Sequence, residues 1–342
     1  MSGQPPPEFS VVVLFGRNQL EPCLSSLLAQ KDADFEIIGV VASEGLKALD
    51  PRVKFLVVPD PNPAKRRNLA VAQSRGKYLA FIDDDAIAPE DWLARAKIYF
   101  EQNPEIAGFG GSNLGPENMT WREQLTDMLL IDKYFGSGTA AYGNFGEPRM
   151  ARPGEVHLSN FFLRREIFEV AKGFNEKIGY GGEDSEMVYW VKKKTDRDFW
   201  FFPELAVIHQ RRPFGWELLK RNFRFRRHNG RMIRLQPDMY EWNVSLWAGP
   251  GFIVAFFIFL VFLHHHQTLF YLADFICCYY FWFFFFSLIR TLRKKKYLAF
   301  IVPGIYFLHH LSYLLGLSAG TAEGLMMGRE KLQQLLGREN LD

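Results

Sequence analysis

The chain has 342 residues, with 41 Lys and Arg against 38 Asp and Glu and a net charge of +3. This charge is too small to indicate a nucleic-acid-binding protein, and three cysteines are too few for a disulfide framework. The composition divides the chain unequally, because residues 1–246 have the mixed composition of a soluble domain and residues 247–320 are dominated by apolar runs.

Short apolar runs alternate with helix-like stretches through the first hundred residues. The apolar runs are 9–15, 36–41, 53–58 and 78–82, and the helix-like stretches are 20–30, 64–74 and 90–102. This alternation is typical of βαβ units and predicts an α/β fold with a mainly parallel sheet. Ligands of such sheets bind beyond the carboxyl ends of the strands, so we expect residues 15–18, 41–43 and 83–85 to surround one nucleotide. The sequence has no glycine-rich phosphate loop of the kind found in nicotinamide-dependent enzymes or nucleoside triphosphatases.

Three consecutive aspartates, Asp83, Asp84 and Asp85, follow the fourth apolar run. Carboxylates this close together repel one another, which indicates a bound cation. Protein-bound Mg²⁺ or Mn²⁺ usually shares its coordination sphere with phosphate oxygens, so a nucleotide diphosphate is the expected ligand. A solvated turn that caps the helix after residue 89 is the alternative interpretation.

A second acidic pair, Glu183 and Asp184, follows Gly181 and Gly182 and precedes a stretch of helical composition. One interpretation is a helix cap that interacts favourably with the helix dipole. The other is a carboxylate held over the metal site as a general base. The presence of two acidic motifs in one domain favours the general base.

Residues 247–263, 269–289 and 298–320 are apolar runs, interrupted by Asp274, His309 and His310. Each is close to the ~20 residues that span a bilayer, so three transmembrane helices are predicted. Buried helices in a large globular core are the alternative.

Basic residues flank these runs. Nine Lys or Arg lie between Arg211 and Arg234, and five more lie in 290–296, whereas 264–268 has none. Basic flanks face the cytoplasm, so a cytosolic catalytic domain on a multi-pass protein of the cell (inner) membrane is predicted. The predicted organisation is a catalytic domain at 1–212, a basic interfacial segment at 213–246, a membrane region at 247–320 and a tail at 321–342.

Between Phe9 and Arg231 the chain resembles the family 2 glycosyltransferases with the GT-A fold, in particular membrane-bound members that build bacterial polysaccharides. The resemblance rests on several motifs taken together, which are Val11-Val12-Val13 with Asn18, residues 64–70, Phe81-Ile82-Asp83-Asp84-Asp85, Gly182-Glu183-Asp184, residues 202–209 and residues 223–231. One departure is Val41-Ala42-Ser43-Glu44-Gly45, where the family commonly has an aspartate that contacts the nucleotide base. The resemblance therefore does not assign the base.

The resemblance implies a Rossmann-like GT-A domain and a role for each matching residue. Asp184 is implied as the general base and Glu183 as its partner at the acceptor. Nucleotide-sugar contacts are implied for Phe15, Asn18, Arg67, Asp83 and Asp84, and Mg²⁺ or Mn²⁺ ligands for Asp83, Asp85 and His209. The expected acceptor or lipid-phosphate contacts are Gly182, Arg211, Arg212, Arg226, Arg227 and Arg231.

The predicted function is inverting, metal-dependent transfer of a sugar from a nucleotide-diphosphate donor to a saccharide acceptor, which is expected to be lipid-linked, at the cytosolic membrane face. A polyprenyl-phosphate glycosyltransferase is an alternative in which the lipid phosphate itself is the acceptor. A transporter or flippase with a nucleotide-binding domain is a further alternative, but three predicted spans are few for a transport pathway. A catalytically inactive scaffold is least favoured because the acidic motifs are intact.

Overall fold

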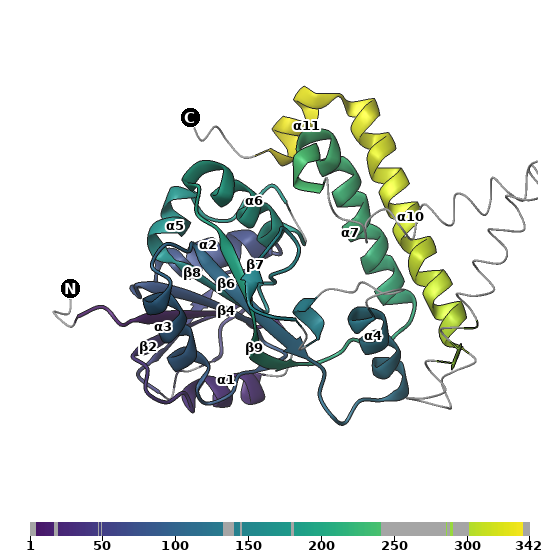
Figure 1. Cartoon of the computed structure of the whole chain (residues 1–342). Helices are drawn as coiled ribbons and strands as arrows, with labels where there is room; N and C mark the ends of the chain where they lie inside the picture. The colour runs from purple at the N-terminus through teal and green to yellow at the C-terminus, as the bar shows by residue number, and fades with distance from the viewer. Residues whose placement is uncertain are drawn as a thin grey trace, which may run out of the picture. The chain divides into compact units, whose positions relative to one another are not determined.

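A computed structural model describes residues 5–16, 20–46, 48, 50–132, 140–143, 146–178, 181–240, 285, 288–289 and 301–337. The chain divides into two compact units. The sheet unit comprises Met1–Glu117, Thr139–Gln210 and Gln333–Asp342, and the helical unit comprises Asn118–Gly138 and Arg211–Leu332. Figure 1 shows the elements of both units along the chain.

The sheet unit is built on one mixed sheet of nine strands. Along the sheet the strand order is β3-β2-β1-β4-β8-β6-β9-β5, and β7 pairs with β9. The strands are β1 (Phe9–Leu14), β2 (Phe35–Val41), β3 (Val53–Val57), β4 (Tyr78–Asp83), β5 (Ala86–Ile87), β6 (Gly108–Leu114), β7 (Arg149–Met150), β8 (Asn160–Arg164) and β9 (Phe199–His209). The helices are α1 (Leu20–Leu28), α2 (Pro63–Ala72), α3 (Trp92–Gln102), α5 (Arg165–Val170) and α6 (Glu183–Thr195), with a 3₁₀ turn η1 (Ala140–Tyr142).

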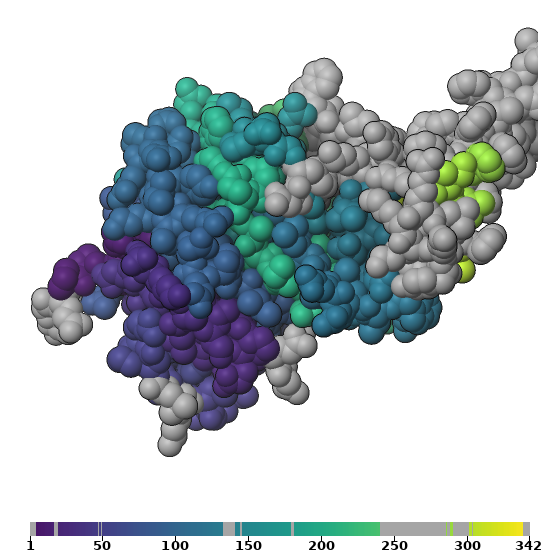
Figure 2. Space-filling view, turned by 60° about the horizontal axis from the view of Figure 1, so that its bottom comes forward, coloured from purple at the N-terminus to yellow at the C-terminus, as the bar shows by residue number. Residues whose placement is uncertain are grey.

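The first four strands are parallel, as the alternation of apolar runs predicts. Their observed bounds agree with the predicted ones to within one residue. The sheet turns antiparallel at β8, which lies between β4 and β6 and opposes both. In the space-filling view the residues before about 60, purple to blue, gather at one end of the sheet unit, where β3 is the edge strand and β2 and β1 follow it (Figure 2).

Two hydrophobic cores cover the two faces of this sheet. On β1, Val11 and Val13 belong to the core shared with α1 and α3, whereas Val12 belongs to the core shared with α2, α5 and α6. This division follows from the period of two along a strand. Burial on both faces also explains why the strands read as continuous apolar runs.

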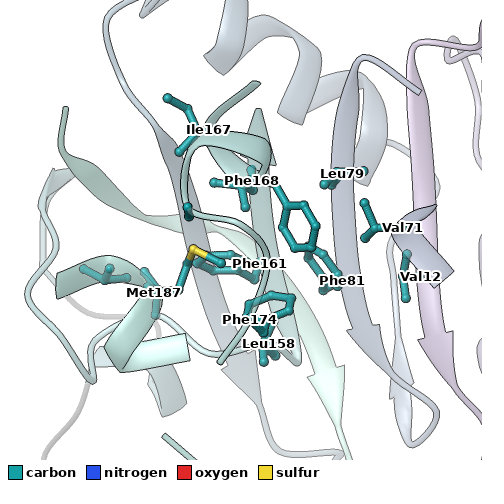
Figure 3. Close-up of a cluster of buried hydrophobic side chains, with 14 of the residues drawn as sticks. Val12, Val71, Leu79, Phe81, Leu158, Phe161, Ile167, Phe168, Phe174 and Met187 are labelled. Atoms are coloured by element: carbon teal, nitrogen blue, oxygen red, sulfur yellow. The ribbon is translucent and has the colours of Figure 1, made fainter. Parts of the chain in front are cut away.

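Aromatic packing holds the end of β4 near the start of α6. Phe174 lies edge-on to Phe81 of β4 at 5.2 Å between ring centroids, and Phe81 also contacts Phe161 of β8 at 6.1 Å. Met187 of α6 belongs to the same core. Figure 3 shows these side chains together between the strands and the helix that begins with the second acidic pair. The core therefore fixes both acidic motifs in one framework.

The helical unit contains α4 (Trp121–Ile131), α7 (Trp216–Leu235), a 3₁₀ turn η2 (Pro237–Tyr240) and α10 (Val302–Met327), and α11 (Arg329–Leu336) continues into the sheet unit. Helices α7 and α10 pack unusually closely, because a Cβ added to Gly320 would lie 1.9 Å from the Arg227 carbonyl oxygen. A Cβ at Gly316 would lie 2.4 Å from the Phe223 carbonyl oxygen. Glycine is therefore needed at both contacts.

None of the described helices is both long and apolar enough to cross a membrane. The predicted span at 298–320 falls largely on α10 and is not supported, since the polar pair His309 and His310 lies within that helix. The predicted spans at 247–263 and 269–289 lie, apart from residues 285 and 288–289, outside the described residues.

Candidate active site

Asp83, Asp85 and His209 form a cluster at the carboxyl end of the parallel strands. One ligand atom from each residue lies within 4.8 Å of the other two. His209 Nε2 is 3.5 Å from Asp83 Oδ2 and 3.3 Å from Asp85 Oδ1. Two carboxylates and an imidazole are a donor set that suits Mn²⁺, and Mg²⁺ accepts the same carboxylates. The predicted metal ligands are thus brought together, and their chemistry fits a divalent cation.

The backbone explains why a histidine from far along the chain reaches the aspartates. Strand β5 begins directly after Asp85, and its first residue, Ala86, is paired with His209 at the end of β9. The Gln210 amide donates to the Asp85 carbonyl oxygen at 3.0 Å. This short antiparallel pair holds His209 beside the acidic turn.

Asp84 has a different role from its two neighbours. Its Oδ2 accepts a hydrogen bond from the Gly16 amide at 2.9 Å, and the side chain is buried. It therefore fixes the loop that follows β1, on which the nucleotide contacts Phe15 and Asn18 were predicted. The Phe15 ring is itself buried against Phe55, with centroids 6.1 Å apart, and Asn18 lies outside the described residues.

Arg66 is a residue at this end of the sheet that the sequence did not single out. Its Nη2 donates to the carbonyl oxygens of Val40 at 2.8 Å and Phe15 at 3.2 Å, which ties α2 to the ends of β2 and β1. Burial lowers the pKa of Arg66, and the neighbouring charge of Arg67 adds to this effect.

Arg67 joins the two acidic motifs. Helix α2 is started by Asn62, whose side chain caps Ala64, and it places Arg67 inside the sheet unit. Arg67 Nη1 donates to Glu183 Oε1 at 2.9 Å, and Nη2 lies 3.7 Å from Asp83 Oδ1. A buried guanidinium therefore lies between the cation cluster and the start of α6.

Glu183 and Asp184 follow two glycines with left-handed backbone, Gly181 at φ +84° and Gly182 at φ +105°. Such angles strain other residues, which explains the glycine pair. Glu183 is buried and bonded to Arg67, and its role at the acceptor stays a prediction. The Asp184 carboxylate keeps 16% of its surface exposed, so it is the more accessible member of the pair.

Burial raises the pKa of both carboxyl groups. The positive charge of Arg67 opposes this effect at Glu183, and the backbone N–H of Ser185 opposes it most at Asp184. Desolvated carboxylates hold protons more strongly than exposed ones, and proton affinity is what a general base requires. Gly182 contributes the backbone turn and has no side chain to contact an acceptor.

His157 is a second residue that sequence reasoning missed. Its Nδ1 lies 3.7 Å from Asp184 Oδ2, and its ring is 5.1 Å from the Tyr142 ring. In the sequence, His157 is a single histidine shortly before β8, and this position alone does not distinguish a functional residue from an ordinary one.

The predicted phosphate-binding arginines lie in the helical unit, and most are ion-paired there. Arg211 Nε donates to Asp127 Oδ1 at 2.7 Å. Arg227 Nε and Arg231 Nε donate to the two oxygens of Glu323 at 2.7 and 2.6 Å. Arg226 is instead buried, with its guanidinium 4.0 Å from the Tyr313 ring centroid, and Arg212 is half-buried.

Comparison with known proteins shows that the first part of this chain is similar to a known family. The family model described as Glycosyl transferase family 2 matches residues 11–169, which include Arg67, Asp83 and Asp85. The second acidic pair and His209 come after the matched residues.

Curated relatives carry related names. Glycosyltransferase AglE of Haloferax volcanii is 30% identical over 166 residues, which are 46% of this chain and 47% of AglE. The chain thus spans about half the length of that relative. Succinoglycan biosynthesis protein ExoM of Rhizobium meliloti is 26% identical over 235 residues, which are 65% of this chain and 70% of ExoM.

A solved structure supports the fold. The mannosyltransferase PcManGT from Pyrobaculum calidifontis, solved in complex with GDP-Man and Mn²⁺, superposes with a TM-score of 0.59 at 15% identity over 90% of this chain and 87% of that chain. An identity this low supports the α/β, GT-A-like architecture alone. Residues 11–169 are thus similar to the family 2 glycosyltransferases, and the whole chain shares its fold with a solved mannosyltransferase.

Proposed function

We propose that the protein is an inverting, metal-dependent glycosyltransferase that moves a sugar from a nucleotide-diphosphate donor to a lipid-linked saccharide acceptor at the cytosolic face of a membrane. The observation that carries this proposal is the placing of two acidic groups in one sheet unit. Asp83, Asp85 and His209 offer cation ligands, while the accessible carboxylate of Asp184 has a pKa raised by burial. Transfer needs both parts, one for the leaving diphosphate and one for the attacking hydroxyl.

A divalent cation held by Asp83, Asp85 and His209 would supply positive charge to the diphosphate as it leaves. Asp184 would accept the proton of the acceptor hydroxyl while that oxygen attacks the anomeric carbon from the face opposite the diphosphate, which inverts the configuration. Glu183 contributes indirectly, by pairing with Arg67. Asp84 keeps the loop after β1 in place for the nucleotide.

Arg226 of the helical unit is proposed to bind the phosphate of a lipid. Arg211, Arg227 and Arg231 are neutralised by carboxylates, but no carboxylate of the described residues lies within 4.0 Å of the Arg226 guanidinium. A largely buried cation without a counter-charge is costly, and an anionic ligand such as a phosphate would relieve that cost. Membrane attachment is proposed through the apolar residues 247–289.

The proposal is tested with purified protein, a panel of nucleotide sugars, and Mg²⁺ or Mn²⁺. One donor should raise the melting temperature only when the cation is present, because ligands that bind the native state stabilise it. Asp85→Asn should remove the cation-dependent part of this shift. Asp196→Asn, at a fully solvent-exposed aspartate, is the matched control and should retain it. A cation-dependent shift that survives in Asp85→Asn would contradict the assignment.

A further inference from the structure

Arg67 is shared by two carboxylates that belong to different parts of the proposed site. Its Nη1 is hydrogen-bonded to Glu183, and its Nη2 is within ion-pair distance of Asp83. Arg67 and Glu183 are 8% and 6% exposed, so solvent screens their interaction weakly. A change in the charge at Asp83 therefore alters the electrostatic interaction of Asp83 with Arg67 and, through Arg67, the interaction of Arg67 with Glu183.

Glu183 depends on Arg67 more than Asp83 does. Its Oε1 accepts the Arg67 hydrogen bond, and its Oε2 is buried without a hydrogen-bond partner among the described residues. Asp83 is 38% exposed at its side chain and lies 3.5 Å from His209. A buried carboxylate that loses its cationic partner is strongly destabilised, so the state of Arg67 controls the start of α6.

We propose that Arg67 is a positioning residue that couples cation binding at Asp83 to the placement of the base Asp184. When a divalent cation occupies the cluster, the Asp83 carboxylate is engaged by that cation and its pull on Arg67 weakens. The guanidinium then pairs more fully with Glu183, which is adjacent to Asp184 and holds the first turn of α6. The inference rests on the proposed function, because it assigns the cation to the cluster and the base to Asp184.

Coupling of this kind is reciprocal, so Glu183 must in turn favour cation binding. Without the Glu183 charge, Asp83 is the one carboxylate among the described residues that pairs with Arg67, and Arg67 competes with the cation for it. Glu183→Gln should therefore weaken Mn²⁺ binding by about fivefold or more, the lower end of typical coupling between sites. The side chain keeps its shape, so the fold should persist.

A double-mutant cycle distinguishes coupling through Arg67 from a direct electrostatic effect of the Glu183 charge on the bound cation. Mn²⁺ binding is measured by electron paramagnetic resonance of the free ion, without substrates, for wild type, Glu183→Gln, Arg67→Gln and the double variant. If Arg67 transmits the effect, Glu183→Gln should no longer weaken binding in the Arg67→Gln background. Glu186→Gln is the matched control, since Glu186 is a buried acid on the same helix that accepts from Asn175.

The second readout is the split between kcat and KM. Arg67→Lys keeps the positive charge, but one ammonium group cannot hold the positions of both Nη1 at Glu183 and Nη2 at Asp83. If Arg67 positions the base, this variant should lower kcat by tenfold or more with little change in donor KM. A Glu183→Gln effect on Mn²⁺ that persists at full size without Arg67 would overturn the coupling and leave the proposed function standing. Absence of Mn²⁺ binding by the wild type would overturn the coupling and the proposed function together. Loss of Mn²⁺ binding in Asp85→Asn, with unchanged binding in Glu183→Gln, would uphold the proposed cation site and overturn the coupling.

Discussion

Replacement of Asp184 by Asn is the sharpest test of the proposed chemistry. Asp184 Oδ1 accepts from the Ser185 amide at 2.7 Å and from its hydroxyl at 3.3 Å, and Oδ2 faces His157 Nδ1 at 3.7 Å. An asparagine can keep the oxygen that serves Ser185 and place its amide toward His157. The variant therefore preserves the shape of the turn and loses the proton affinity.

We expect turnover to fall by about 10²–10⁴-fold, the usual contribution of a positioned base. This corresponds to about 3–5 kcal/mol on the activation free energy. The upper half of the range is expected, because burial raises the pKa of Asp184 and so makes it a better proton acceptor than an exposed aspartate. Donor affinity should barely change, since the cation cluster is formed by Asp83, Asp85 and His209.

The assay is the initial rate of sugar transfer at saturating donor, with donor affinity measured separately by calorimetry. Glu186→Gln serves as the control for loss of a buried acid on the same helix and should retain most activity. Retained turnover with lost donor affinity would move Asp184 to the nucleotide site. Retained turnover with intact donor affinity would favour a lipid phosphate acceptor, which is already ionised at neutral pH and needs no base, or a helix-capping role for Asp184.

Three further predictions follow from other parts of the molecule. Asp184 must be ionised to act as a base, and burial raises its pKa, while the Ser185 amide and Arg67 oppose the rise and Glu183 and His157 are its other titratable neighbours. Turnover should therefore increase with pH through an acid limb that lies above the ordinary aspartate pKa of about 3.8. The measurement is log kcat against pH, and a limb at or below about 3.8 would contradict the prediction. Gly320→Val should lower the free energy of unfolding, measured by denaturant titration, by about 3 kcal/mol, because its Cβ would lie 1.9 Å from the Arg227 carbonyl oxygen. Gly304→Val on the same helix has open space around its Cβ and should lower the free energy of unfolding far less. Arg226→Met should weaken binding of a lipid-linked saccharide by about tenfold or more, and Arg224→Met, which removes an exposed charge from the same helix, should not.

The three aspartates predicted a cation cluster, but their sequence did not show which of them belong to it. The alternation of side chains along a strand does not apply here, because β4 ends at Asp83 and Asp84 and Asp85 form a turn. In the structure Asp84 is bonded to Gly16, whereas Asp83 and Asp85 face His209. The approach of His209 was not predictable from local pattern, because it depends on the two-residue strand β5, which is too short to give a period.

In the helical unit, the sequence predicted a basic segment, and the structure pairs Arg211, Arg227 and Arg231 of that segment with carboxylates. Glu323 lies 92 residues after Arg231 and pairs with it, and no sequence pattern within α7 predicts that contact. A signal for the close helix pair was present in the spacing of Gly316, Gly320 and Gly324. Glycines four apart share one face of a helix and permit the close backbone approach that is observed.

The acidic pair at the start of α6 shows how one turn separates two roles that sequence alone cannot distinguish. Successive residues of a helix point about 100° apart, so Glu183 and Asp184 cannot face the same surroundings. Glu183 turns inward to Arg67, and Asp184 keeps the exposed surface beside His157. The second carboxylate is therefore the proposed base, while the first is linked through the buried Arg67 guanidinium to Asp83 of the cation cluster. The proposed base and the cation cluster thus lie at the two ends of one series of charged groups, joined by the Arg67–Glu183 hydrogen bond and the Arg67–Asp83 ion pair, and a change at either end should be detectable at the other.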